Sequence, residues 1–238
     1  MKNLFTFISC ALIIFIAVSC NQEKKETEKE TKKETVEKKD SVASPAPIIV
    51  NTPDDAIKAL KDGNIRFTEN KLVNTNYPER IQQTKEGQTP HSVVLTCMDS
   101  RVPPEIIFDQ GIGNIFTLRV AGNIEDDNVL GSMEYAVEHA KSKLIVVMGH
   151  NHCGAVTGAV HDYELGNLTQ LLEQIKPAIK SDPEKPETVD ETAKNNVSLT
   201  IEDILKKSKI IREMVEKKEI SIVGAFYDLE TGLVSFME

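Results

Sequence analysis

Two short stretches of the chain hold side chains of the types that commonly bind metal ions. CMDSR covers residues 97–101, and GHNHCGA covers residues 149–155. Cys97, His150 and Cys153 offer two thiolates and one imidazole, which are typical zinc ligands. Structural zinc sites are closed by four protein ligands, whereas three ligands leave a position open for water or substrate. The residue types therefore predict a catalytic zinc site with these three ligands.

An acidic and a basic residue follow the first cysteine. If the chain stays extended there, residues two apart point to the same side, so Cys97, Asp99 and Arg101 share a face. Zinc lowers the pKa of a bound water to about 7, and Asp99 can orient the resulting hydroxide by accepting its hydrogen bond. Arg101 would keep Asp99 ionised and in place. We expect both residues to be catalytic, and Asp99 to be a zinc ligand only in a closed state.

Two simpler interpretations compete with this one. Cys97 and Cys153 could form a disulfide in an oxidising compartment, but His150 would then have no role. Asp99 and Arg101 could be a structural ion pair, which would be the natural interpretation if the cysteines and the histidine were absent. Because the two motifs occur together, the sequence favours a catalytic site.

The elements that must position these residues alternate between strands and helices. Apolar runs predict buried strands over residues 92–96, 115–120, 144–148 and 220–227. Apolar spacing predicts helices over 128–141, 154–161 and 202–217, and a capping signal at Thr52 starts another. Residues 181–196 are polar and contain prolines, so we expect a surface excursion there.

This alternation predicts a single α/β domain over residues 48–238. Its central sheet should be mostly parallel and flanked by helices on both faces. Parallel sheets place their sites at the carboxyl ends of strands, and the two motifs follow the strands predicted at 92–96 and 144–148. The motifs can therefore meet in space although they lie far apart in the sequence.

The N-terminal residues predict export and anchoring. Residues 1–20 contain an apolar run too short to span a bilayer and end at Cys20, which resembles a bacterial lipoprotein signal with Cys20 lipidated. An ordinary secretory signal or an uncleaved anchor is the alternative. Residues 21–47 hold lysines and acids in equal number and few apolar side chains, which predicts a disordered charged tether. We expect a protein of the bacterial cell envelope, anchored by lipid to a membrane.

Composition excludes other classes of protein. The chain has 238 residues and a net charge of −9, which argues against nucleic-acid binding. Its four cysteines are too few for a disulfide scaffold. Cys10 lies in the predicted signal, Cys20 is the predicted anchor, and the other two are the predicted zinc ligands.

CMDSR and GHNHCGA resemble the C-x-D-x-R and H-x-x-C motifs of the β-class carbonic anhydrases. Further similar stretches are TPDDAIKALKDGNIRF, IFTLRVAGN, LGSMEYAVEHA, LIVVMGH and IVGAFYDLETG. The resemblance implies reversible hydration of CO2 to bicarbonate, with one Zn2+ per subunit on Cys97, His150 and Cys153 and an Asp99–Arg101 dyad. It also implies four parallel strands with an added antiparallel strand. The subunits would form a homodimer or higher homo-oligomer, with the sites near the subunit interface.

The same resemblance implies a substrate pocket at Gln88, Phe116, Tyr135 and Gly154. Two alternative functions remain open at this level. One is a non-catalytic zinc-binding or redox surface protein on the same fold. The other is a hydrolase of a CO2 analogue, COS or CS2, which would share the fold and the zinc ligands.

Overall fold

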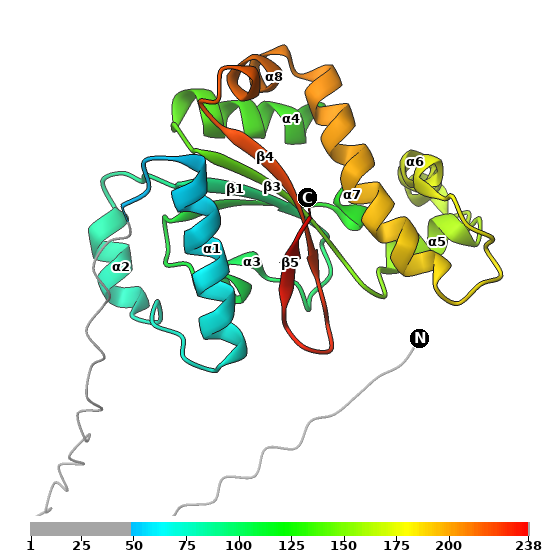
Figure 1. Cartoon of the computed structure of the whole chain (residues 1–238), viewed down its shortest axis with the longest axis horizontal. Helices are drawn as coiled ribbons and strands as arrows, with labels where there is room; N and C mark the ends of the chain where they lie inside the picture. The colour runs from blue at the N-terminus through cyan, green and yellow to red at the C-terminus, as the bar shows by residue number, and fades with distance from the viewer. Residues whose placement is uncertain (1–48, 238) are drawn as a thin grey trace, which may run out of the picture. The chain divides into compact units, whose positions relative to one another are not determined.

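A five-stranded sheet with the strand order β2-β1-β3-β4-β5 forms the centre of the computed structural model, which describes residues 49–237 (Figure 1). β1 (Ser92–Thr96), β2 (Ile115–Arg119), β3 (Leu144–His150) and β4 (Ser221–Tyr227) are parallel, and β5 (Val234–Phe236) is antiparallel to β4. The structure thus confirms the predicted sheet. The predicted signal over 1–20, the tether over 21–47 and Cys20 lie outside the described residues.

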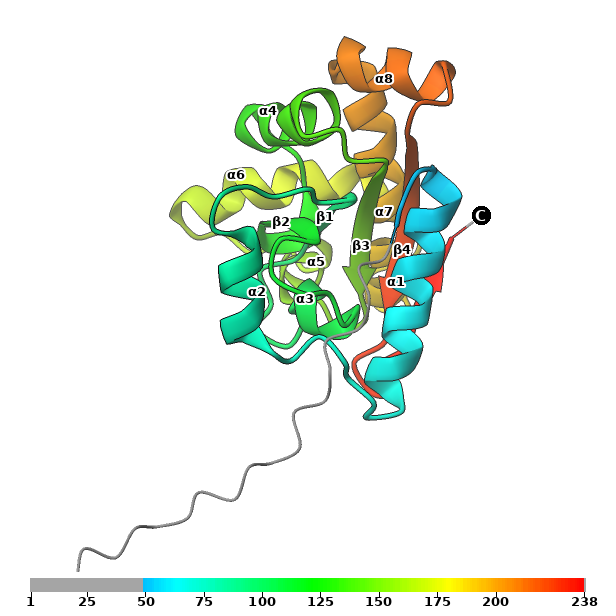
Figure 2. The ribbon, with the colours of Figure 1, turned by 90° about the vertical axis from the view of Figure 1, so that its left-hand side faces the viewer.

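Every residue of β1 and β3 is buried, so both faces of the sheet must be covered. Helices α1 and α7 lie on opposite sides of the sheet in Figure 1, and Figure 2 shows α8 beside α4. One face packs on α1 and α3, and the other packs on α4, α7 and α8. These helices are α1 (Pro53–Thr68), α3 (Pro104–Ile107), α4 (Asp127–Glu134), α7 (Thr188–Lys207) and α8 (Lys209–Glu216).

A third apolar cluster closes the carboxyl ends of the strands. It contains side chains from α5 (Gly154–Val160), α6 (Gly166–Ile175) and α7, together with Cys97 and Cys153. The remaining helical segments are α2 (Tyr77–Thr84), a π-helical turn (Tyr135–His139) and two 3-10 turns (Ala121–Asn123 and Lys176–Ala178). Within residues 49–237, no helix combines the length and the apolar character needed to cross a bilayer.

The largest departure from the sequence prediction is α7. Residues 181–196 were expected to form a surface excursion, which is wrong from Thr188 onward, because α7 begins there and packs on β3. The polar composition was misleading because Thr192 and Asn196 are buried although polar. The helix predicted over 202–217 is also divided. Ser208 ends α7, and its hydroxyl accepts a hydrogen bond from the Ile211 N–H at 3.1 Å to begin α8.

The start of α1 agrees with the sequence. The Thr52 hydroxyl accepts from the Asp55 N–H at 3.1 Å, and the Asp55 carboxylate accepts from the Thr52 N–H at 3.0 Å. This reciprocal capping satisfies backbone donors that the first helical turn cannot pair. The hydrogen bonds also lower the pKa of the Asp55 carboxyl, with the Thr52 side chain as the largest cause.

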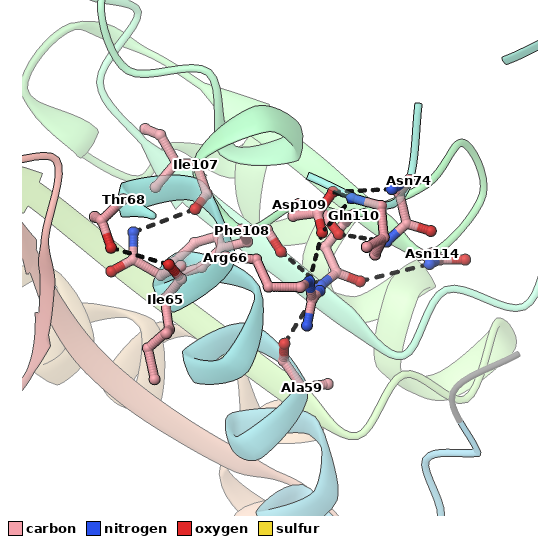
Figure 3. A network of polar contacts seen from close by, with 12 residues as sticks. Ala59, Ile65, Arg66, Thr68, Asn74, Ile107, Phe108, Asp109, Gln110 and Asn114 are labelled. Atoms are coloured by element: carbon pink, nitrogen blue, oxygen red, sulfur yellow. Dashed lines mark hydrogen bonds and ion pairs between the residues drawn. The ribbon is translucent and has the colours of Figure 1, made fainter. Parts of the chain in front are cut away.

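A buried carboxylate joins this helical layer to the chain that follows the CMDSR motif (Figure 3). Asp109 is 3% exposed, and its side chain accepts from Arg66 Nε at 2.6 Å and from the Val73 and Asn74 N–H groups at 3.2 and 3.0 Å. The Asn74 amide returns a hydrogen bond to the Asp109 carbonyl at 2.6 Å. One carboxylate therefore fixes both the end of α1 and the loop before α2.

We predict that Asp109→Ala lowers the free energy of unfolding by about 3–5 kcal/mol, because it leaves the Arg66 guanidinium and two backbone N–H groups without their acceptor. Asp62→Ala is the matched control, since it removes an exposed ion pair with Lys58 on α1 and should cost less than about 1 kcal/mol. Urea denaturation followed by circular dichroism measures both values. Equal losses for the two variants would contradict this role for Asp109.

Candidate metal centre

Cys97, His150 and Cys153 come together at the carboxyl end of the sheet. Cys97 directly follows β1, His150 is the last residue of β3, and Cys153 immediately precedes α5. Their ligand atoms all lie within 4.8 Å of one another, and all three residues are buried. The two Sγ atoms are 3.9 Å apart, almost twice the length of a disulfide bond, and both cysteines are free. The structure therefore holds two thiols and one imidazole, without the disulfide.

The orientation of His150 is that of a metal ligand. Its Nδ1 lies 2.8 Å from the Asn151 carbonyl oxygen. A carbonyl can only accept, so Nδ1 carries the hydrogen and Nε2 is left with a free lone pair. Nε2 is buried and has no hydrogen-bond partner of normal geometry, although it lies near enough to Cys97 for the two side chains to affect each other's pKa. An unpaired nitrogen beside two sulfur atoms is costly to bury unless a cation binds there, so these residues fit Zn2+.

A hydrogen bond from Cys153 to Cys97 links the two thiols. The hydrogen bond from Cys153 is the largest cause of the low pKa of Cys97, about 4, and burial opposes it. The same hydrogen bond, together with burial, raises the pKa of Cys153. Cys153 therefore keeps its proton in this structure, and both sulfur atoms could ionise together only if a divalent cation bound between them.

Three backbone contacts hold the segment that carries His150 and Cys153. The Asn151 N–H donates to the Tyr227 carbonyl at 3.3 Å, and the side-chain oxygen of Asn151 accepts from the Leu229 N–H at 2.8 Å. His152 has a φ of 52°, in the left-handed region, and its N–H donates to Asp190 Oδ1 at 2.9 Å. Sequence reasoning missed Asp190, because nothing in its local pattern distinguishes it from the other acids of residues 181–196.

Asp99 and Arg101 form a bidentate ion pair beside the cluster of Cys97, His150 and Cys153. Arg101 Nε and Nη2 lie 3.0 and 2.7 Å from Asp99 Oδ1 and Oδ2, and the Arg101 N–H donates to Oδ1 at 2.9 Å. The expectation that the chain stays extended here is wrong. It turns, with the Val102 N–H bonded to the Asp99 carbonyl at 3.0 Å, and this turn brings the two side chains together.

The pairing determines the charge of Asp99. The hydrogen bond from the Arg101 side chain lowers the pKa of the Asp99 carboxyl to about 2, although partial burial opposes the shift. Asp99 is therefore ionised across the physiological pH range. The segment itself is held by Arg119, which donates from Nε to the Cys97 carbonyl at 3.2 Å and from Nη2 to the Asp99 carbonyl.

The predicted pocket residues are spread more widely. Gly154 adjoins Cys153, and open space surrounds the position that a Cβ would take there. Phe116 and Tyr135 line a separate groove of about 420 Å³ beside β2, with ring centroids 6.2 Å apart. Phe116 pairs with Val93, four residues before Cys97, which places it roughly 13 Å from the metal-binding end of the sheet. Gln88 is exposed in the loop before β1.

Comparisons with known proteins agree with this geometry. The family model described as "Carbonic anhydrase" matches residues 92–234. "Carbonic anhydrase 2" of Mycobacterium tuberculosis is 37% identical over 193 residues, covering 76% of this chain and 90% of that protein. The carbonic anhydrase of Mycolicibacterium smegmatis is 37% identical over 191 residues, covering 77% and 93%.

Solved structures show the same fold. A β-carbonic anhydrase of the ascomycete Sordaria macrospora, described as tetrameric, is 27% identical with a TM-score of 0.62, covering 77% of this chain and 97% of that one. A β-carbonic anhydrase of Aspergillus fumigatus has the same TM-score at 24% identity, covering 78% and 90%. With the family match and the Cys-His-Cys cluster at the ends of β1 and β3, this chain belongs to the carbonic anhydrase family and has the β-class fold.

Proposed function

We propose that this protein is a zinc enzyme that reversibly hydrates CO2 to bicarbonate and a proton. Cys97, His150 and Cys153 would hold one Zn2+ per chain. The observation that carries the proposal is the buried, unpaired His150 Nε2 within 4.8 Å of two sulfur atoms. Membership of the carbonic anhydrase family supports the reaction.

Zinc bound by three protein ligands would lower the pKa of a water in the open position and so supply a nucleophile at neutral pH. Asp99 would accept a hydrogen bond from that water and orient it toward CO2. It can do so because it is ionised, and because Oδ2 accepts only one hydrogen bond from Arg101 and keeps a second lone pair, whereas Oδ1 already accepts two. Arg101 would hold Asp99 in this orientation and prevent it from turning toward the metal ligands.

We also propose a homo-oligomer with the sites near the subunit interface. Phe116 and Tyr135 are too far from Cys97 to contact a substrate bound at the cluster of the same chain. In a dimer that pairs the β2 groove of one chain with the cluster of the other, the two rings and Gln88 could contact CO2 or bicarbonate. The tetrameric assembly of the Sordaria protein supports an oligomer.

The N-terminal residues complete the proposal. We propose that residues 1–20 are a lipoprotein signal, that Cys20 carries the lipid, and that residues 21–47 are a spacer. The enzyme domain, residues 48–238, would then be held to a membrane of the bacterial cell envelope. The apolar run that ends shortly before Cys20 supports this assignment.

We expect wild-type protein to contain one zinc per chain and to hydrate CO2, and Asp99→Asn to keep the zinc while losing about 100-fold or more in kcat. The neutral amide has the shape of the carboxylate but accepts poorly and cannot pair with Arg101 as an ion. Stopped-flow measurement of proton release, with metal analysis of the same samples, makes the comparison. Asp62→Asn, which changes an exposed carboxylate paired with Lys58 on α1, is the control and should retain the wild-type rate. A zinc-loaded wild type without activity would instead favour a non-catalytic zinc protein.

Mass spectrometry of the mature N-terminus tests the anchor. In a bacterial host that processes lipoproteins, we expect the chain to begin at Cys20 with a diacylglyceryl group and to sediment with membranes. Cys20→Ser should abolish both, whereas Cys10→Ser should change neither, because Cys10 lies within the segment that is removed. An unmodified N-terminus in the wild type would disprove the lipid anchor.

A further inference from the structure

A backbone N–H contacts the sulfur of Cys97. The Gly122 nitrogen lies 3.4 Å from Cys97 Sγ, in the turn that follows β2, and both residues are buried. A hydrogen bond to a thiolate withdraws electron density from the sulfur, and such outer contacts adjust how strongly a ligand binds its metal. The direction of this one N–H therefore bears on the properties of the metal centre.

The direction of this N–H depends on an unusual backbone conformation. Gly122 has a φ of +69°, where residues other than glycine are strained, and a Cβ there would lie 2.5 Å from Ile175 Cδ1. Glycine is required, but it is also the residue whose backbone is least restricted. Another group must hold the Gly122 peptide if its N–H is to stay directed at the sulfur.

The Asn123 N–H closes this turn by donating to the Val120 carbonyl at 2.9 Å, and Asn196 holds the Gly122 carbonyl itself. The Asn196 Nδ2 donates to the Gly122 carbonyl at 2.7 Å, and the residue is 1% exposed on α7, 74 positions along the chain. Neighbouring residues of α7 pack on β3 and on the apolar cluster around the metal ligands, which keeps the helix fixed. The position of the Gly122 carbonyl oxygen depends on the φ and ψ angles of Gly122. A hydrogen bond that holds this oxygen therefore restricts both angles.

We propose that Asn196 is a positioning residue of the metal centre. It fixes Gly122 so that the Gly122 N–H points at Cys97 Sγ, and it thereby determines the electron density on that ligand and the rate at which the metal leaves. This rests on the proposed function, since it requires a metal on Cys97. The competing explanation is that Asn196 only satisfies a buried carbonyl and contributes to stability alone.

The next residue of α7 provides a matched control. Asn195 also donates its Nδ2 to a backbone carbonyl, that of Ala178 at 3.2 Å, but Ala178 lies in the turn after α6 and contacts none of the metal ligands through this bond. Asn195→Ala and Asn196→Ala each remove one amide from the same helix. If Asn196→Ala changes the metal centre and Asn195→Ala does not, the loss of a side-chain amide from α7 cannot by itself be the cause.

The experiment uses full-length protein in which Co2+ replaces Zn2+. For Asn196→Ala we expect the thiolate-to-cobalt charge-transfer band to move to longer wavelength, because the sulfur regains electron density. We also expect Zn2+ transfer to a chelator to become about 10-fold faster or more, because a sulfur that has lost its hydrogen bond is more basic and is protonated more readily as the metal leaves. Asn195→Ala should change neither measurement. If Asn196→Ala folds poorly, Asn196→Ser makes the same comparison, because its shorter side chain cannot span to the Gly122 carbonyl.

The two proposals fail in different ways. A wild-type protein that shows no thiolate-to-cobalt band would overturn the metal site itself, and with it the proposed function. A wild type with a normal band, together with Asn196 and Asn195 variants that share the same band position and the same zinc release rate, would overturn only the role of Asn196.

Discussion

Two buried sulfur atoms 3.9 Å apart, beside an imidazole nitrogen without a partner, are the constraint on which the rest of the structure depends. Polar atoms are seldom buried unpaired, and two neighbouring thiolates repel each other. A divalent cation would satisfy all three ligands at once, and three protein ligands would leave one coordination position free. Asp99, held by Arg101, then lies beside the cluster as an ionised hydrogen-bond acceptor.

Parallel pairing of β1 with β3 brings the three ligand side chains together. Thr96 of β1 is in register with Met148 of β3, so the residues that follow each strand, Cys97 and His150 among them, emerge at the same edge of the sheet. Helix α7 then reaches both ligand segments, through Asp190 to the His152 N–H and through Asn196 to Gly122. A helix far along the chain thus holds two segments that the sheet alone only brings close.

The sequence was sufficient to predict the four parallel strands, the convergence of Cys97, His150 and Cys153, and the Asp99–Arg101 pair, because apolar runs and paired Cys and His motifs are local patterns. It was insufficient for α7. Thr192 and Asn196 are polar residues at buried positions, and only the tertiary structure shows that Asn196 bonds to Gly122. It also failed at the turn after Cys97, where hydrogen bonds from Arg101 and Val102 to Asp99 override the extended conformation.

The structure points to a three-ligand metal site beside the Asp99–Arg101 pair. A crystal structure of the full-length protein, with anomalous data collected on both sides of the zinc edge, tests it most directly. We predict a single zinc peak per chain among Cys97 Sγ, His150 Nε2 and Cys153 Sγ, with Asp99 still bonded to Arg101. A peak at other residues, or Asp99 on the zinc with Arg101 unpaired at neutral pH, would contradict it.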